Sequence, residues 1–450
     1  MSGISPDGKR AVRSAEVRQA TRAAAVGSFV EWFDFALYGL LATNLSVVFF
    51  PSHDSTSSLL SLFAVFGAAF VVRPLGAFYF GSLGDRIGRK RILVIVITAM
   101  SLSTFLVGLL PMREAAGAWV TFALVALRLV QGFSAGGEIG GANTFVAEFA
   151  EPDRRGYRVS FTLASGLAAI ACAALVTFFL QFSLSPAAMT AWGWRFPFLV
   201  AGPLGLVGLY IRMRLNDSPD FARLETADEV SDRPVREIVR KNYWVVLQTI
   251  GLVCMLFAAQ YVVTAYLVTY QKQVLRLSGA TATFSTVLTV FLAAVLTPVF
   301  GRLCDRWGRK PVLFAGCGGF AVMSYPMFAL LSPGAVLPAV LVDVLMGCLL
   351  ATLVGPVSVM MTELFPTRVR NSGASIGYNI GGALFGGPAP YLATALTASF
   401  GATAPAFILI GAAVVTIVAC FFVPETAGSS IASDVTAPRS DSAATANPPN

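Results

Sequence analysis

Long apolar runs separated by short polar segments fill most of this 450-residue chain. Hydrophobic residues make up 56% of it and charged residues only 12%, whereas a soluble globular domain carries about 25% charged residues. So few charged side chains cannot cover a surface that faces water. A helix that crosses a membrane needs roughly 20 apolar residues, and the chain holds about twelve such runs. We therefore predict an all-α membrane protein with about twelve transmembrane helices.

Positive charge is distributed unevenly among the polar segments. If the N-terminus lies in the cytoplasm, twenty-six of the 32 Lys and Arg residues fall on the cytoplasmic side and four on the other side. This asymmetry is the positive-inside rule, so both termini are expected in the cytoplasm of a bacterium, with the chain in its cytoplasmic membrane. The basic balance is thus a topology signal, and no nucleic-acid partner is expected. The predicted spans are 23–50, 57–82, 91–112, 117–148, 158–183, 195–213, 243–271, 281–303, 311–332, 336–363, 372–397 and 403–423.

The longest polar segment between spans divides the predicted helices into two sets of six. We expect these two bundles to be joined by a cytoplasmic linker and flanked by cytoplasmic tails, the second of them disordered because it is rich in Ser, Ala, Thr and Pro. The predicted parts are a tail at 1–22, a six-helix bundle at 23–213, a linker at 214–242, a second bundle at 243–425 and a tail at 426–450.

A ten-residue segment occurs twice in the chain. Residues 81–90 read Gly-Ser-Leu-Gly-Asp-Arg-Ile-Gly-Arg-Lys, and residues 301–310 match them at seven of ten positions. A weaker repeat places Glu148 and Glu363, each followed by arginines, at corresponding positions after the fourth and tenth spans. Because the matched signals recur in the same order, the halves are predicted to be parallel repeats, as in transporters that rock between two states.

The repeated loop, the Arg128-Leu-Val-Gln-Gly run and the linker resemble the major facilitator superfamily. Within it, Glu31-Trp-Phe-Asp-Phe, Arg73-Pro-Leu-Gly, Gln131-Gly-Phe-Ser-Ala-Gly-Gly-Glu and Trp192-Gly-Trp-Arg-Phe-Pro are similar to the metabolite:proton symporters, a family with proline/betaine, α-ketoglutarate, citrate and shikimate carriers. The resemblance implies proton-coupled uptake of a small organic solute, either a carboxylate or a zwitterion. The energy source would be the proton gradient, with no cofactor.

Other functions are compatible with parts of this pattern. A proton-driven efflux antiporter is the first alternative, although the span at 158–183 lacks the GPxxGG run that antiporters of the superfamily show. A solute receptor that does not transport is the second. An enzyme is not expected, because the sequence shows no nucleophile–base pair and no phosphate-binding loop. His53 is the only histidine and the six cysteines show no CxxC pairing, so no metal site is expected either.

Ionisable residues inside the spans are the candidates for proton coupling. Each costs roughly 2.5–3.5 kcal/mol in the membrane and so needs a partner or a function. Glu31 and Asp34 share one helix face, and the helical rise places Arg73 and Glu138 at a similar depth. We predict that these four residues form the proton-coupling site. A static ion pair that joins three helices is the alternative.

Arg128 is the main candidate for substrate binding, because its planar guanidinium suits a carboxylate. The repeat offset relates it to Asp343, so the two are predicted either to hold the ends of a zwitterion or to form a gating pair; a place for Asp343 at the outer rim is the alternative. The other predicted cavity residues are Arg73, Tyr38, Gln260, Tyr261, Tyr378 and Asn379.

The resemblance to the superfamily implies that the repeated loops form a conformational latch at the cytoplasmic surface. Each Asp would lie at the N-terminus of a neighbouring helix, where the helix dipole favours an anion. Charges that only set the topology are the alternative. The predicted latch residues are Asp85, Arg86, Arg89, Asp305, Arg306, Arg309, Glu148 and Glu363. We expect a monomer in the lipid bilayer, with proton coupling in the first half and the second half completing the substrate cavity.

Overall fold

All regular elements of the described chain are helices, as predicted. A computed structural model describes residues 6–87, 89–136, 143–144, 146–147, 150–213, 242–366 and 370–428. The linker predicted at 214–242 therefore lies outside the described residues except for its last one. The N-terminal helix begins at Pro6, well inside the segment predicted as a tail.

The helices match the predicted spans within a few residues at most boundaries. In the first half they are α1 (Pro6–Leu40), α2 (Ala42–Phe49), α3 (Ser55–Ile87), α4 (Arg89–Leu109), α5 (Arg113–Ala116), α6 (Trp119–Ala135), η1 (Pro152–Arg154), α8 (Arg155–Ser183), α9 (Pro186–Ala188), η2 (Met189–Gly193) and α10 (Arg195–Met213). In the second half they are α13 (Tyr243–Tyr261), η3 (Val262–Tyr266), α14 (Leu267–Gln273), α15 (Gly279–Trp307), α16 (Arg309–Ala329), α17 (Val336–Glu363), α18 (Arg370–Gly381), η5 (Gly382–Gly386), α19 (Ala389–Phe400) and α20 (Pro405–Phe421).

By length and composition, six uninterrupted stretches of the described chain could cross a membrane, and the bent pair α1–α2 could form a seventh crossing. These six are α3, η1–α8, α13–η3–α14, α15, α16 and α17. Four shorter apolar helices, α4, α6, α10 and α20, and the broken helix α18–η5–α19 occupy the other predicted spans. The twelve-helix architecture predicted from the sequence is confirmed.

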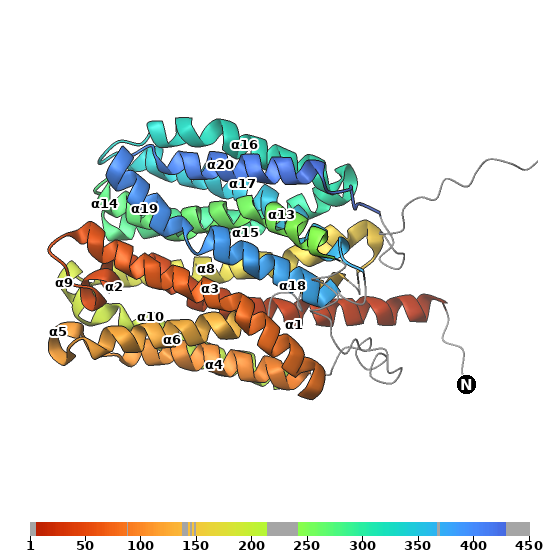
Figure 1. The fold of residues 1–450 in the computed structure, drawn as a ribbon, viewed down its shortest axis with the longest axis horizontal. Coiled ribbons are helices and arrows are strands. Elements are labelled where there is room, and N and C mark those ends of the chain that lie inside the picture. Colours follow the sequence, from red (N-terminus) through yellow and green to blue (C-terminus); the bar gives the residue numbers. More distant parts are fainter. Residues whose placement is uncertain are drawn as a thin grey trace, which may run out of the picture.

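The two halves lie side by side along the length of the bundle. Figure 1 shows the first half, red to yellow, below the second half, green to blue, with α8 beside α15 at the seam. Helices α1 and α3 also contact the second half, through η3 and α18. We call the end where α1 begins and α20 ends the proximal end, and the end that carries α2, α5, α9 and α14 the distal end (Figure 1).

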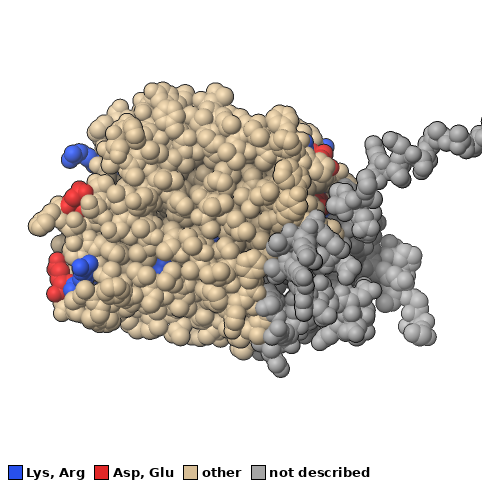
Figure 2. Space-filling view, in the orientation of Figure 1, with Lys and Arg blue, Asp and Glu red and all other residues tan. Residues whose placement is uncertain are grey.

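Apolar side chains cover the outer surface between these ends. Figure 2 shows charged side chains near the two ends of the molecule and almost none on the broad surface between them. Large apolar side chains are exposed on these helices; Phe122, Phe182, Val322 and Phe421, for example, are each more than 70% exposed. Such a continuous apolar surface would aggregate in water and is suited to lipid.

Three short π-helical segments interrupt the described helices. They are η2, η3 and η5, and the last two lie in the second half, between α13 and α14 and between α18 and α19. The first crossing is also broken, with a bend of 68° between the helical segments 24–40 and 42–49. π-helical turns are rare and occur frequently at functional sites, and residues 264 and 265 of η3 line the cavity described below.

Glycines allow α3 and α6 to pack with their backbones in contact. A Cβ atom on Gly132 would lie 2.0 Å from the Ala69 carbonyl oxygen, and one on Gly136 would lie 2.0 Å from that of Arg73. This contact fixes the position of α6 against the turn of α3 that carries Arg73.

Replacing Gly132 with alanine is expected to destabilise the protein by about 1–3 kcal/mol, because the backbones must separate to admit the methyl group. The measurement is the thermal unfolding midpoint of the purified protein in detergent. Gly318→Ala in α16 is the matched control, since no atom lies within 4 Å of the added Cβ there. Equal midpoints for the two variants would contradict the close packing.

Candidate functional site

A buried ion pair joins the first two crossings at the centre of the first half. Glu31 Oε1 accepts a hydrogen bond from Arg73 Nη2 at 2.8 Å, and the two side chains are 2% and 1% exposed. The Arg73 guanidinium also lies over the rings of Phe35 and Phe70, 4.3 and 4.7 Å from their centroids. The structure thus brings together two of the four residues predicted to couple protons.

Asp34 and Arg128 are connected through two neutral side chains. Asp34 Oδ2 accepts from Thr104 Oγ1 at 3.0 Å, and Gln131 Nε2 lies 2.6 Å from the same hydroxyl. Gln131 Oε1 in turn accepts from Arg128 Nη1 at 3.0 Å. All four side chains are buried, so a change of charge on Asp34 can reach Arg128 through one chain of hydrogen bonds.

Arg128 is surrounded mainly by aromatic rings. Its guanidinium carbon lies 3.9 Å from the Tyr38 ring centroid, 4.5 Å from that of Phe35 and 5.1 Å from that of Phe66. Among the described residues, no carboxylate lies within 4.0 Å of it, and Arg128 Nε and Nη2 have no hydrogen-bond partner. A fully buried guanidinium with two free donors can bind an anionic group.

A small cavity lies between the halves beside this cluster. Its volume is about 10 Å³, room for roughly one water molecule. A solute would therefore need a larger opening than this structure provides. The lining residues come from both halves and are largely aromatic or apolar: Trp32, Phe35, Ala36, Phe66, Ile170, Tyr261, Thr264 and Ala265.

The predicted cavity residues of α13 and α18 lie either in the cavity lining or buried outside it. Tyr261 lines the cavity, and Tyr378 is buried one ring further away, packed on Phe257 with ring centroids 4.6 Å apart and the ring planes tilted by 55°. Asn379 is buried and donates to the Gly136 carbonyl of the first half at 3.3 Å. Gln260 is buried on α13. Glu138 lies outside the described residues.

Arg128 and Asp343 are not paired with each other in this structure, and their roles as a gating pair or as the two ends of a zwitterion site stay predictions. Asp343 is buried on α17, at 2% exposed. Its carboxylate accepts from Gln271 and Ser285, both in the second half, whereas the carboxamide of Gln131 occupies Arg128 Nη1. The repeat offset placed both residues on corresponding helices but did not show which side chains face each other.

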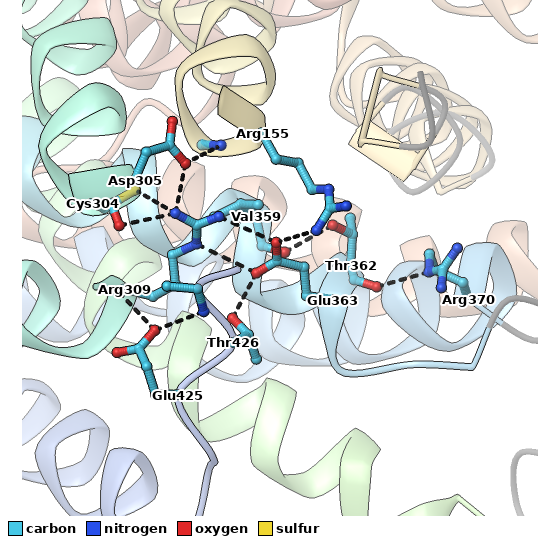
Figure 3. A network of polar contacts seen from close by, with 12 residues as sticks. Arg155, Cys304, Asp305, Arg309, Val359, Thr362, Glu363, Arg370, Glu425 and Thr426 are labelled. Atoms are coloured by element: carbon cyan, nitrogen blue, oxygen red, sulfur yellow. Dashed lines mark hydrogen bonds and ion pairs between the residues drawn. The ribbon is translucent and has the colours of Figure 1, made fainter. Parts of the chain in front are cut away.

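Glu363 is the centre of a charged network at the proximal end (Figure 3). Its Oε1 lies 2.8 Å from Arg155 Nη1 of the first half and 3.3 Å from Arg309 Nη2 of the second. Glu363, Arg155 and Arg309 are each at most 3% exposed at their side chains. One buried carboxylate thus holds arginines from both halves together.

Asp305 makes a second connection between the halves at this end. Its two carboxylate oxygens accept from the backbone N–H of Gly156 and Tyr157, at 2.9 and 2.8 Å, at the N-terminus of α8 (Figure 3). Arg309 Nη1 donates to the same carboxylate at 2.6 Å. A Cβ on Gly156 would lie 2.8 Å from Asp305 Oδ1, so glycine is needed for this approach. This is the position that the sequence predicts for the Asp of the loop.

The structure shows less of the remaining predicted latch residues. Arg306 is exposed and has no ion pair among the described residues. Glu148 lies outside the described residues, and so do the side chains of the first loop copy, namely Asp85, Arg86 and Arg89.

The segment after α20 adds two contacts that the sequence did not indicate. Glu425 accepts from the backbone N–H of Arg309 and of Lys310, at 2.8 and 3.0 Å, and so caps the N-terminus of α16. Thr426 Oγ1 donates to Glu363 Oε2 at 2.6 Å. Residues at the predicted boundary of the C-terminal tail are therefore part of the charged network.

The Glu425 cap should make stability depend on pH. Burial raises the pKa of the Glu425 carboxyl, but the backbone N–H groups of Lys310 and Arg309 outweigh burial and hold the pKa below its usual value. A carboxyl of lowered pKa stabilises the fold above its unfolded pKa of about 4.3, and this contribution is lost as the pH falls through the folded value. The unfolding midpoint of Glu425→Gln is therefore expected below that of wild type at about pH 6, and the difference should shrink as the pH falls below about 4. A difference that stays constant with pH would contradict this role.

Polar side chains also join the halves at the distal end. Lys272 Nζ lies 3.5 Å from Thr43 Oγ1, and the amide of Gln181 on α8 lies 2.7 Å from Thr283 Oγ1 of α15. Between these contacts and the cavity, Gly39 of α1 packs directly on Ala265, with only 2.6 Å from a Cβ built on the glycine to that of Ala265. The halves are thus in contact at both ends.

The sequence pattern of the sugar (and other) transporter family matches residues 20–433. The chain belongs to this family, within the major facilitator superfamily. The transporter is 34% identical over 434 residues to the glycine betaine/proline/ectoine/pipecolic acid transporter OusA of Dickeya dadantii, covering 94% of this chain and 86% of that protein. It is also 34% identical to the proline/betaine transporter of Escherichia coli K12, covering 92% and 84% of the two chains.

One further relative and one solved structure are also similar to the transporter. The citrate-proton symporter of Klebsiella pneumoniae is 34% identical over 371 residues, 82% of this chain and 83% of that protein. The solved structure of the proton:xylose symporter XylE has a TM-score of 0.75 at 19% identity, over 93% of this chain and 98% of that one, and so shows the same fold. The chain is a membrane transporter of the alternating-access type and not an enzyme, as its resemblance to the superfamily implied.

Proposed function

We propose that this transporter is a proton-coupled symporter that takes up a small organic solute, a carboxylate or a zwitterion. The observation that carries the proposal is the chain of hydrogen bonds from Asp34 through Thr104 and Gln131 to Arg128. It links a carboxyl that can take up a proton to a guanidinium with free donors, beside a cavity between the halves. The solute and the proton would thus bind to one hydrogen-bonded cluster.

The chemistry around the cavity supports a zwitterionic solute. Arg128 offers donors for a carboxylate, and the aromatic lining suits the other end of the molecule. The Trp32 and Tyr261 rings are stacked with centroids 6.4 Å apart, and Phe66 meets Tyr261 edge-on at 5.5 Å. Aromatic faces attract quaternary and secondary ammonium groups by cation–π interaction. Proline and betaine, named for the relatives above, combine these two groups, while citrate offers carboxylates only.

Alternating access would proceed by breaking one set of contacts between the halves at a time. Opening the proximal end requires Glu363 and Asp305 to release Arg155 and the N-terminus of α8. Opening the distal end requires Lys272 and Gln181 to release Thr43 and Thr283. Arg73 and Glu31 would take part in coupling by exchanging partners as the central cavity enlarges.

The topology inferred from the loop charges completes the proposal. The proximal end would face the cytoplasm of a bacterium, with both termini there, and the distal end would face outward across the cytoplasmic membrane. The halves would move as the units 23–213 and 243–425 about the linker at 214–242. The transporter would work as a monomer in the lipid bilayer and draw its energy from the proton gradient.

The proposal is tested by uptake of labelled solutes into cells or proteoliposomes that contain the whole protein. The panel is proline, glycine betaine, ectoine, citrate and α-ketoglutarate, each with and without a protonophore. Accumulation of at least one solute that the protonophore abolishes is expected. Accumulation that is indifferent to the protonophore, or export against a proton gradient, would overturn the proposed function.

A further inference from the structure

A buried carboxyl in the second half takes no part in the central cluster. Asp343 Oδ2 accepts from Gln271 Nε2 at 2.6 Å and from Ser285 Oγ at 2.7 Å. All three side chains are buried. In the described part of the chain, no Lys, Arg or His nitrogen lies within 4.0 Å of this carboxyl. An ionised carboxylate without a cation is costly in such a place, so the charge state of Asp343 requires an explanation.

One added proton would supply the hydrogen-bond donor that two buried oxygen atoms of this group lack. Asp343 Oδ1 and Gln271 Oε1 are both buried, and neither has a hydrogen-bond partner among the described residues. Both are acceptors, and the Nε2–Oδ2 bond already joins the two side chains. A protonated carboxyl can donate from Oδ1, and an amide oxygen can accept that bond. One proton therefore supplies the donor that both atoms lack and completes an acid–amide pair.

No neighbouring charge is paired with Asp343 among the described residues, and Arg276, in the loop between α14 and α15, is exposed. Lys272 follows Gln271 directly, but its ammonium reaches across to Thr43 of the other half. On the same helix, the Tyr270 hydroxyl donates to a backbone carbonyl, and Tyr325 of α16 is exposed on the outer surface. The distal turns of α8 and α15, residues 173–183 and 279–301, contain no ionisable residue.

The two donors to Asp343 lie next to the contacts that close the distal end. Gln271 precedes Lys272, which reaches Thr43 of α2. Ser285 lies two residues after Thr283, whose hydroxyl is 2.7 Å from the Gln181 amide of α8. Asp343 thus holds α14 and α15 together at the point where each of them touches the first half.

We propose that Asp343 and Gln271 form a second proton-binding site, which holds the distal end closed when it is protonated. The proton comes from the distal compartment and forms an O–H bond on Asp343 Oδ1, with Gln271 Oε1 as the acceptor. On deprotonation the negative oxygen faces an amide oxygen, the pair loosens, and α14 and α15 are freed to leave the first half. The use of this proton in transport rests on the proposed function, whereas its binding does not.

Infrared difference spectroscopy of the whole reconstituted protein tests the site directly. Between acidic and alkaline pH, a C=O stretching band of a buried protonated carboxyl is expected. Asp343→Asn should remove it, and should fold, because the new amide can donate where the acid did. Asp54→Asn, which changes an exposed carboxyl near the distal end, should keep it. Because Asp34 is also a buried carboxyl proposed to bind a proton, the comparison is made in Asp34→Asn; a band that persists there after Asp343→Asn is added would overturn the inference.

Two further measurements distinguish this site from proton coupling in general. Gln271→Leu should move the band to higher wavenumber, because the acid loses its amide partner; an unmoved band would count against the pair. In Asp34→Asn, which is expected to keep solute exchange, exchange without a proton gradient should vary with pH and become flat when Asp343→Asn is added. If uptake proves indifferent to protons while the band behaves as expected, the proposed function fails and the proton site stands. If uptake is proton-driven but the band is unaffected by both variants, the site fails alone.

Discussion

Asp34→Asn is expected to abolish solute accumulation while solute exchange across the membrane continues. Asparagine can still accept from Thr104 Oγ1, so the hydrogen-bond chain to Arg128 and the fold are retained. It cannot take up and release a proton, so the proton gradient no longer drives the solute. A membrane potential of 100 mV supplies about 2.3 kcal/mol per charge, which supports roughly 50-fold accumulation for one coupled proton. The variant should fall from about this level to equal concentrations on both sides.

The measurement is the steady-state ratio of labelled solute inside and outside proteoliposomes, together with exchange of labelled for unlabelled solute. Glu114→Gln, an exposed acid in α5, is the control and should accumulate solute as wild type does. Loss of both accumulation and exchange in Asp34→Asn would assign Asp34 to solute binding. Unchanged accumulation would remove it from proton coupling altogether.

Glu363→Gln is expected to release the proximal end. The substitution leaves Arg155 without the carboxylate of Glu363 and leaves Arg309 with Asp305 alone. Breaking a buried ion pair by removing one partner costs about 3–5 kcal/mol, so the closed state should lose at least ~100-fold in population relative to the open one. Cys304 is a built-in reporter, because it is fully buried within the same network. Its alkylation should become faster by up to a similar factor.

Alkylation of Cys304 by a membrane-impermeant maleimide, followed by peptide mass spectrometry in inside-out vesicles, measures this opening. Glu151→Gln is the matched control, since this acid lies at the same end but is 53% exposed at its side chain. The control should react as slowly as wild type. Equal rates for Glu363→Gln and wild type would show that Glu363 does not hold the proximal end closed.

The sequence predicted the architecture and the residues with charge, but not their partners. Glu31 and Arg73 could be placed at one depth because the helical rise is fixed, and Asp305 could be placed at a helix N-terminus because the loop resembles that of the superfamily. The connection from Asp34 to Arg128 could not be predicted, because Thr104 and Gln131 are neutral and cost little in a helix. The only signal for them was a polar residue within an apolar run.

Contacts between helices that are far apart in the sequence explain the other differences between prediction and structure. The repeat offset related Asp343 to Arg128 and left its partners open, whereas the packing of α14, α15 and α17 brings it to Gln271 and Ser285. The π-helical turn η3 depends on tertiary packing against α1 and α19, which no local pattern reveals. Glu425 and Thr426 lie at the edge of a segment whose composition indicated only a polar tail.

The direction of proton movement tests the central claim most directly. Proteoliposomes in a weakly buffered medium, without any initial gradient, receive a solute that the uptake panel has identified, and the pH outside is followed. Symport predicts that the medium becomes alkaline as solute enters, and that Asp34→Asn gives no such signal. Acidification of the medium, or solute entry without any change in pH, would contradict the account.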